Sequence, residues 1–431
     1  MSTSSISPVP HFTTALTGPL LQLERQILDR QSAIESWFRS QWRRAPAPFY
    51  ASVDLRNSGY KVAPVDTNLF PGGFNNLNPA FDALSIQALQ QAVEHLGVPV
   101  DRIAIVPESH TRNLFYLENI AVLQRLLERA GFAVRLGSLL PELNDETVIA
   151  LPSGASIRLT PLARNGRRVA VGDFDPDFVL LNNDLSSGAP SILEDIEQTL
   201  RPAPKLGWAN RLKSVHFSFY QGVAKEFAAL LGIDPWFIDP MFRNCGAIDF
   251  MKHEGQSCLE RNVEELLEAI TRKYAEYAVQ CRPFVMVKAD AGTYGMGVMS
   301  AHSVAEVMEL NRKQRTRMST TKAGQKVSKV IIQEGVYTNE TWGEGNAVAE
   351  PVVYMIDHNV VGGFYRVHTG RSSSENLNAP GMRFEPLAFE ECCITPDPTQ
   401  APDAHPNRFY TYGVIGRLAL LAAARESQSV A

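Results

Sequence analysis

Residues 282–300, RPFVMVKADAGTYGMGVMS, have the composition of a phosphate-binding segment. An apolar run predicts a strand that ends at Lys288, and a cluster of glycines follows it. Glycines at this density let backbone N–H groups approach a phosphate without an intervening Cβ, and a nearby ammonium neutralises the phosphate charge. We therefore expect a phosphorylated cofactor to contact Lys288, Gly292, Thr293, Tyr294, Gly295 and Gly297.

The order of these residues excludes several phosphate-binding motifs. A P-loop requires Gly-Lys-Ser/Thr at the start of a helix, and the sequence contains none. A dinucleotide fingerprint reads GxGxxG, whereas this run reads GxxGxG and leads into another strand-like stretch. A protein kinase places its glycine loop before the strand lysine, and here the lysine comes first. Strand, lysine, glycine loop and strand is the order found in ATP-grasp ligases, which this segment resembles.

The resemblance to ATP-grasp ligases implies two further nucleotide contacts. These ligases have an earlier phosphate-contacting lysine, and Lys252 lies 36 residues before Lys288. Downstream, KVIIQEGV (329–336) has the form of the strand and hinge that hold adenine and ribose, although an ordinary buried strand is the alternative. On the first interpretation Glu334 accepts hydrogen bonds from the ribose, and the hinge consists of Gln333, Glu334, Gly335 and Val336.

Magnesium bound across the ATP phosphates needs hard oxygen ligands. The candidates are Glu350, Asp357, Glu375, Asn376 and Asn378. The sequence offers Glu-Asn-x-Asn at 375–378, where the ATP-grasp family usually has Glu-x-Asn. The resemblance also implies that Arg366 stabilises the transferring phosphoryl group, with Arg371 as the alternative. Lys288 and Arg366 are therefore the expected catalytic residues.

A stretch dense in Asn, Gly and Pro, residues 54–79, opens like a short strand and is the candidate substrate loop. Long loops inside compact domains are usually functional or disordered, and the charged, amide and aromatic side chains here argue against disorder. Cations can bind a carboxylate and Asp can bind an ammonium, which suits a small zwitterion. Asn side chains that cap their own turns are the alternative. The expected substrate-binding residues are Arg56, Lys61, Asp66, Asn68, Asn75 and Asn76.

The remaining pattern predicts a mixed α/β (α+β) fold. Apolar residues recur at helical spacing over 19–44, and helices and strands alternate over 81–184, as in a twisted, mostly parallel sheet. His216 is expected to be a half-buried histidine with satisfied hydrogen bonds. We expect an N-terminal helical segment (1–45), an α/β substrate domain that precedes the ATP-grasp region (46–246), and an ATP-grasp-like domain (247–431).

Composition limits the functional class. The 431 residues carry a formal net charge of −5, which gives no electrostatic footprint for binding nucleic acid. No export signal is visible, and no apolar run approaches the roughly 20 residues that span a bilayer. The five cysteines include no CxxC, so we expect reduced thiols in a cytoplasmic protein. We expect small molecules as partners, neither nucleic acid nor membrane, and leave a homo-oligomer open.

Five stretches of the chain carry a second resemblance: DLRNSGYKVAPVDTNLFPGGFNNLNP, LGWANRLKSVHFSFY, VMVKADAGTYGMGVM, SSSENLNAPGMRFEPL and FYTYGVIGRLALLAAA. They extend from about Asp54 to the C-terminal helix, and the first and third are the most specific. Together they resemble the proteobacterial family of glutamate–cysteine ligases. The resemblance implies ATP- and Mg²⁺-dependent joining of glutamate and cysteine through a γ-glutamyl phosphate, the first step of glutathione synthesis. Another ATP-grasp carboxylate–amine ligase, acting on amino acids or a peptide tail, and a non-catalytic ATP-binding sensor are the alternatives.

Overall fold

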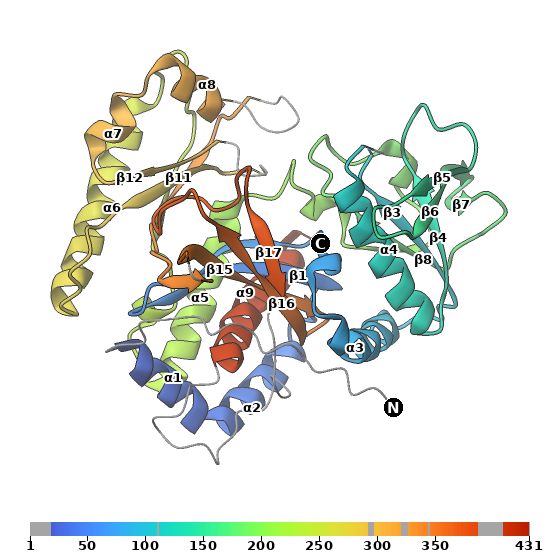
Figure 1. Ribbon diagram of the computed structural model, residues 1–431, viewed down its shortest axis with the longest axis horizontal. Helices are drawn as coiled ribbons and strands as arrows, with labels where there is room; N and C mark the ends of the chain where they lie inside the picture. Colours follow the sequence, from blue (N-terminus) through green and yellow to red (C-terminus); the bar gives the residue numbers. More distant parts are fainter. Residues whose placement is uncertain are drawn as a thin grey trace.

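The computed structural model describes residues 19–109, 112–291, 297–319, 326–343, 345–386 and 408–430. Within these residues the strands form three sheets, each with helices packed against it (Figure 1). These sheets and helices confirm the expected mixed α/β class. No helix in the described part of the chain is long and apolar enough to cross a membrane.

A mostly parallel, seven-stranded sheet forms the right-hand lobe in Figure 1. Its strands and helices are α3 (Asp82–Glu94), β3 (Arg102–Pro107), α4 (Leu114–Arg129), β4 (Ala133–Ser138), β5 (Thr147–Ala150), β6 (Ser156–Asn165), β7 (Arg168–Val171), β8 (Phe178–Asn182) and β9 (Thr199–Arg201). The strand order is β5-β6-β4-β3-β8-β9, with β7 beside β6. Ile103 and Ile105 pack with α4, while Ala104 and Val106 belong to the core on the opposite face. Burial on both faces explains why β3 is continuously apolar in the sequence.

A six-stranded antiparallel sheet lies at the centre of the molecule (Figure 1). Its order is β17-β16-β15-β1-β2, with β14 beside β15. The strands are β1 (Tyr50–Asn57), β2 (Val62–Asn68), β14 (Glu340–Trp342), β15 (Ala347–Ile356), β16 (Asn359–His368) and β17 (Arg383–Pro386). Because β1 pairs with β15, strands from both sides of the expected boundary at residue 246 share this sheet. The division into three units stays a prediction.

The first part of the expected substrate loop is the β1–β2 hairpin. Gly59 has a φ of +81°, which favours glycine, and its N–H donates to Oδ1 of Asn57 at 2.9 Å. The strand-like opening at 54–57 is thus β1, and a second strand, which sequence analysis did not separate from the loop, begins at Val62. The hairpin places Arg56 and Asp66 on the sheet and Lys61 at the end of the turn that joins its two strands.

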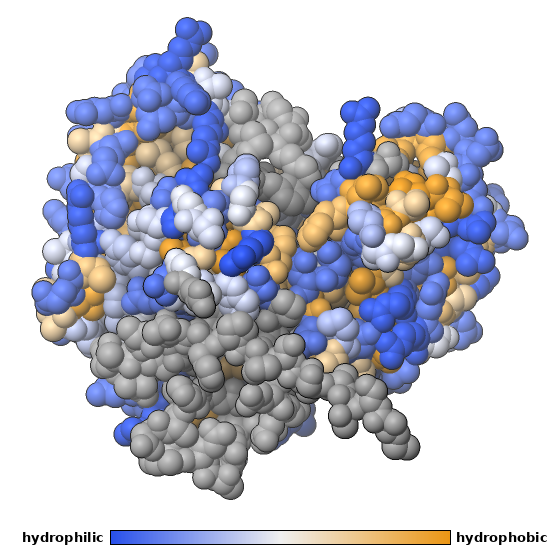
Figure 2. Space-filling view, viewed as in Figure 1, coloured by the Kyte–Doolittle hydropathy of each residue, from blue (hydrophilic) through white to orange (hydrophobic). Residues whose placement is uncertain are grey.

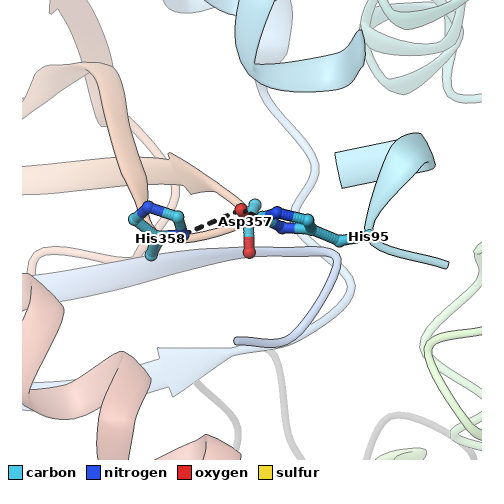
Figure 3. Close-up of side chains that lie close together, drawn as sticks. All are labelled: His95, Asp357 and His358. Atoms are coloured by element: carbon cyan, nitrogen blue, oxygen red, sulfur yellow. Dashed lines mark hydrogen bonds and ion pairs between the residues drawn. The ribbon is translucent and has the colours of Figure 1, made fainter. Parts of the chain in front are cut away.

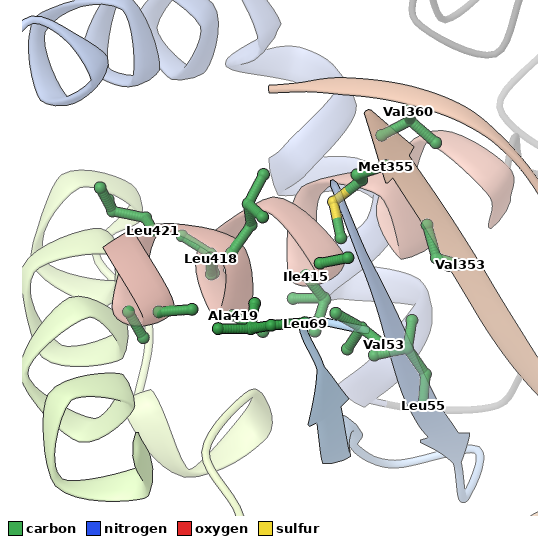
Figure 4. Packing of buried hydrophobic residues seen from close by; sticks show 14 of the residues in the cluster. Val53, Leu55, Leu69, Val353, Met355, Val360, Ile415, Leu418, Ala419 and Leu421 are labelled. Carbon is green, nitrogen blue, oxygen red and sulfur yellow. The ribbon is translucent and has the colours of Figure 1, made fainter. Parts of the chain in front are cut away.

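The C-terminal helix α9 (Arg408–Val430) is buried beneath the six-stranded sheet, beside α5 (Lys213–Leu231). Figure 4 shows Ile415, Leu418 and Ala419 of α9 in one core with Val53 of β1 and Val353 of β15. Each of these side chains is fully buried. The last helix of the chain therefore packs in one core with β1, the first strand, and with β15.

The expected N-terminal helix is present as two helices, α1 (Pro19–Asp29) and α2 (Gln31–Trp42). The backbone of Arg30 leaves the helical region, with φ −108° and ψ 18°, and separates them. Ile27 of α1 and Ile34 of α2 are fully buried in the core that contains α9. The break lets two apolar helix faces cover one core.

The third sheet has four antiparallel strands and the order β10-β13-β11-β12. Helix α6 packs against β10, β11 and β13, and α7 contacts α6 and β12. In the space-filling view a notch at the top separates the right-hand lobe from the lobe that holds this sheet (Figure 2). Its elements are β10 (Phe242–Cys245), α6 (Gln256–Glu276), β11 (Val285–Ala289), β12 (Val298–Ala301), α7 (Val304–Met308), α8 (Arg312–Ser319) and β13 (Val330–Glu334).

Candidate active site

Lys288 lies where β11 of the four-stranded sheet meets β2 of the six-stranded sheet. Val285 and Val287 belong to the core that includes α6, so the alternation of the strand turns Lys288 to the other face. Its Nζ donates to the carbonyl of Val65 at 2.9 Å and to Oε1 of Gln333 at 2.8 Å. Burial lowers the pKa of Lys288 to about 8. An ammonium has three donors and two are used within the described residues, so a third N–H remains there for an anionic oxygen.

Asp66 and Lys213 form a second charged group beside Lys288. Asp66 Oδ1 lies 2.7 Å from Lys213 Nζ. Burial acts to raise the pKa of Asp66, but Lys213 and Lys288 hold it at about 2. Lys213 begins α5, and Asp290 caps that helix by accepting from the N–H and the Oγ of Ser214, each at 2.7 Å. The residues that follow Lys288 in the chain thus fix Lys213.

Two arginines and two carboxylates form a buried network on the six-stranded sheet. Arg366 Nη1 lies 2.8 Å from Asp54 Oδ2 and 2.5 Å from Glu350 Oε1, and Arg56 Nε lies 3.0 Å from Glu350 Oε2. Glu350 and Arg366 face each other across β15 and β16. Burial acts to raise the pKa of Glu350, but Arg56 and Arg366 lower it. Within the described residues Nε of Arg366 is buried without a hydrogen-bond partner, which leaves a donor for an added acceptor.

A cavity of about 290 Å³ lies between β11, β12, α8 and residues 371–376. Met286, Met299 and Met318 give it an apolar wall of adaptable side chains, which suits the face of a planar base. Gln333 pairs with Met286 across the sheet, and its Nε2 is buried without a partner among the described residues. The polar lining consists of Ser300, Gln314, Arg317, Arg371, Glu375 and Asn376.

Two matches to known proteins identify the family. The family profile described as Glutamate-cysteine ligase (GshA) matches residues 24–427. A crystal structure from Methylobacillus flagellatus KT, provisionally named as a gamma-glutamylcysteine synthetase, is 58% identical, with a TM-score of 0.91 over 98% of this chain and 99% of that chain. The chain belongs to the glutamate–cysteine ligase family. The ligase is accordingly an ATP-dependent enzyme.

More distant structures were also found. A glutathione synthetase-like effector from Globodera pallida is 10% identical, with a TM-score of 0.38 over 81% of this chain and 78% of that chain. The D-alanyl-alanine synthetase A of Vibrio cholerae is 12% identical, with a TM-score of 0.35 over 74% and 80%. Both TM-scores are below 0.5, so neither structure supports a statement about the ligase. No match was found among curated proteins.

The ligase holds Lys61 and Glu334 in a buried ion pair, with Nζ and Oε2 2.6 Å apart and neither side chain more than 1% exposed. Trp236 Nε1 donates to the other oxygen of Glu334 at 3.0 Å. Burial lowers the pKa of Lys61, and Glu334 opposes that shift. The expected substrate contact of Lys61 and ribose contact of Glu334 would need exposed side chains, and the structure exposes neither. Because the Glu334 side chain is used in this way, the groups of the expected hinge that remain for a nucleotide are its backbone and the side chain of Gln333.

Replacing Lys61 with methionine should destabilise the ligase by about 3–5 kcal/mol, because Glu334 would keep a buried charge without a cation. The double variant Lys61→Met/Glu334→Gln should recover much of this loss. Urea unfolding measures both, and Lys225→Met, at an exposed position of α5, is the control that should change stability by less than about 0.5 kcal/mol. An equal loss in the single and double variants would contradict the ion-pair explanation.

The other expected substrate residues are dispersed. Arg56 is held by protein groups, since besides Glu350 it donates to the carbonyls of Val336 and Ser373, each at 3.2 Å, and to the carbonyl of Glu375. Asn68 Oδ1 accepts from the N–H of Phe70 at 2.9 Å and from Trp208 at 3.3 Å, as a turn cap would. Asn75 and Asn76 lie in a 3₁₀ turn (Phe74–Asn76) beside α4. Of the six residues, Asp66 acts to raise the pKa of Lys288 and Arg56 acts to lower it.

The expected metal ligands separate into three places. Glu375 and Asn376 line the 290 Å³ cavity, where Glu375 accepts from Arg371 at 2.7 Å and Asn376 Oδ1 accepts from the N–H of Asn378 at 3.0 Å. Glu350 is held by two arginines instead. Asp357 directly follows the last residue of β15, roughly 20 Å along the strand from Glu350.

The remaining nucleotide candidates lie on loops. Lys252 is exposed between β10 and α6 and does not line the 290 Å³ cavity. Gly297 has a φ of +63°, which favours glycine, and its carbonyl accepts from the N–H of Ala289 at 3.0 Å. Gly292, Thr293, Tyr294 and Gly295 lie outside the described residues.

Sequence analysis missed several charged residues of this region. Asp54 and Lys213 pair with expected site residues. Asp54 is the first residue of the expected substrate loop and Lys213 lies in one of the five family stretches, but neither was named as a site residue. His216 is more deeply buried than expected, and its two ring nitrogens are hydrogen-bonded, as expected; the partners are Glu426 and Thr67, each at 3.0 Å. Arg211 binds both oxygens of Glu426, at 2.9 and 2.8 Å. The sequence signal that could have identified these residues is the cluster of Arg, Lys and His at 211–216, which lies at one edge of the site.

Proposed function

We propose that the ligase phosphorylates the γ-carboxylate of glutamate with ATP and joins the acyl group to the α-amine of cysteine, the first step of glutathione synthesis. A carboxylate oxygen attacks the γ-phosphorus and ADP leaves; the amine then attacks the acyl carbon, loses a proton, and phosphate leaves. A carboxylate is a poor electrophile because its leaving group is oxide, whereas phosphate leaves readily. One observation carries this proposal. Lys288 of the four-stranded sheet contacts β2 of the six-stranded sheet, which also holds Arg366, and a cavity suited to a planar base lies beside them.

In this proposal ATP binds between the four-stranded sheet and residues 371–376, as in an ATP-grasp fold. The methionine wall would take the adenine, and the unpartnered amide of Gln333 would donate to the nucleotide. Lys288 and the glycine loop would neutralise the phosphates. Mg²⁺ would bind Glu375 and Asn376, whose oxygens suit a hard cation, and would supply further charge neutralisation when bound.

The amino-acid substrates are placed beside Asp66 and Lys213. A carboxylate and an ammonium side by side can bind the α-ammonium and α-carboxylate of one amino acid. Asp66 stays ionised at all ordinary pH values, because its pKa is about 2. Arg366, whose Nε has no hydrogen-bond partner among the described residues, would stabilise the transferring phosphoryl group. We place this reaction in the cytoplasm, where thiols such as cysteine stay reduced.

The test is phosphate release from ATP and Mg²⁺, measured with glutamate alone, with cysteine alone and with both. We expect sustained release only with both amino acids, and a product whose mass is that of the dipeptide. Release without dependence on either amino acid would overturn the substrate assignment. Omitting Mg²⁺ in the presence of a chelator should abolish release, which tests the metal separately.

ATP affinity should fall as pH rises through about 8. The protonated Lys288 attracts phosphate oxygens and the neutral amine does not, so the Kd of a non-hydrolysable ATP analogue should rise up to tenfold per unit above pH 8. ATP binding weakens at alkaline pH because burial lowers the pKa of Lys288, so this lysine loses its proton earlier than an exposed lysine does. Lys288→Arg should move the loss to higher pH, since a guanidinium stays charged. Calorimetric titration across pH 7–10 measures both proteins, and identical profiles would contradict the assignment.

A further inference from the structure

Among the described residues, one group of side chains brings three metal-ligand atoms together away from the ligase site. His95 follows α3, and Asp357 and His358 form the turn between β15 and β16 (Figure 3). Nδ1 of His95 lies 2.9 Å from Asp357 Oδ2, and Nδ1 of His358 lies 2.8 Å from the same oxygen. The three ligand atoms all lie within 4.8 Å of one another.

The backbone and its neighbours hold this group in position. Asp357 is buried, has a φ of +50° in the turn, and its N–H donates to the carbonyl of Phe49 at 2.8 Å. The His358 ring stacks on Trp42, with centroids 6.0 Å apart. The rings of His95 and His358 are nearly parallel, at 17°, on either side of the carboxylate. A carboxylate fixed between two imidazoles from different elements is a preorganised donor set.

The donor types select the class of cation. Two imidazole nitrogens and one carboxylate oxygen suit zinc and similar borderline divalent cations, whereas Mg²⁺ prefers oxygen ligands. Tetrahedral zinc with bonds near 2.0–2.1 Å sets its ligand atoms roughly 3.4 Å apart. The present separations of 2.8 and 2.9 Å would have to open by about half an ångström. The two imidazoles can make that shift, since their side chains are 55% and 32% exposed.

We infer that His95, Asp357 and His358 bind a zinc-class cation, with water in the fourth position. The cation takes the place of the direct contacts between the two Nδ1 atoms and Asp357 Oδ2, and it joins the end of α3 in the seven-stranded lobe to the six-stranded sheet. Because Asp357 is about 20 Å along β15 from Glu350, this cation plays no part in the ligase chemistry. The bound cation connects the seven-stranded lobe to the central six-stranded sheet.

Cobalt and zinc titrations of the full chain test this site. The metal-free protein should bind one equivalent of Zn²⁺ in competition with a chromophoric chelator, and Co²⁺ should give the visible absorbance of a four-coordinate site without a thiolate charge-transfer band. His95→Ala, at an exposed position that should not disturb folding, should raise the Kd more than tenfold, and so should His358→Ala. Zn²⁺ should raise the Tm of the parent and not of these variants.

Two controls separate this site from others in the chain. Cys245 and Cys258 have sulfur atoms only 2.6 Å apart and can also bind zinc, so Cys258→Ser should retain the equivalent that the histidine variants lose. His302→Ala, a histidine outside the group, should also retain it. Equal zinc affinity in the parent and in the His95→Ala/His358→Ala variant would overturn the inference, as would loss of the equivalent in Cys258→Ser.

Discussion

Lys288→Met should lower the turnover of the ligase by roughly 10²–10³-fold and leave it folded. In the proposed site the ammonium is the cation that faces the ATP phosphates, and removal of one preorganised charge-stabilising donor typically costs this much. Two opposing effects keep the change in stability small. Val65 and Gln333 lose a donor, but a buried ammonium whose pKa is lowered to about 8 is also removed.

Phosphate release with both amino acids measures the turnover, and thermal unfolding checks the fold. Lys225→Met removes an exposed lysine of α5 and should retain full activity. Lys288→Arg keeps the charge but changes its shape, so it should fall between the parent and Lys288→Met. If Lys288→Met keeps more than a tenth of the parent turnover, the proposed role of this lysine fails.

The position of Lys288 could be predicted from sequence because its cause is local. Strand alternation and the apolar run before it decide which face of β11 carries the ammonium. The pairs that shape its surroundings have no such local cause. Lys61 and Glu334 are 273 residues apart in the chain, and Arg366 and Asp54 are 312 apart. Their residue types made them look like ligand contacts, whereas the packing of two sheets turned Lys61 and Glu334 toward each other.

The partners of Arg56 could not be predicted either, because they too are far away in the sequence. A cation in a polar stretch is a reasonable carboxylate binder, and Arg56 does bind a carboxylate, that of Glu350. Its other donors hold the carbonyls of Val336 and Ser373. Arg56 therefore links the hinge to the loop that lines the cavity. Sequence periodicity identifies the strand on which such a residue lies but not the partner across the sheet.

Arg366→Met should destabilise the ligase by about 3 kcal/mol and also abolish most turnover. Asp54 would lose its cation, while Glu350 would keep Arg56 at 3.0 Å. A carboxylate left at a largely buried site without its partner accounts for the loss of stability. Arg102→Met is the matched control, since it breaks an exposed pair with Asp177 and should cost less than about 1 kcal/mol.

The double variant Arg366→Met/Asp54→Asn separates the two effects of this arginine. Neutralising Asp54 removes the uncompensated charge, so urea unfolding should show most of the stability restored. If Arg366 stabilises the transferring phosphoryl group, turnover should stay at least about 10²-fold below the parent in the refolded double variant, because no carboxylate change replaces that donor. Recovery of turnover together with stability would show that Arg366 acts only on the fold. Among the described residues the Nε of Arg366 has no hydrogen-bond partner, so this donor remains for a phosphoryl oxygen and favours the first outcome.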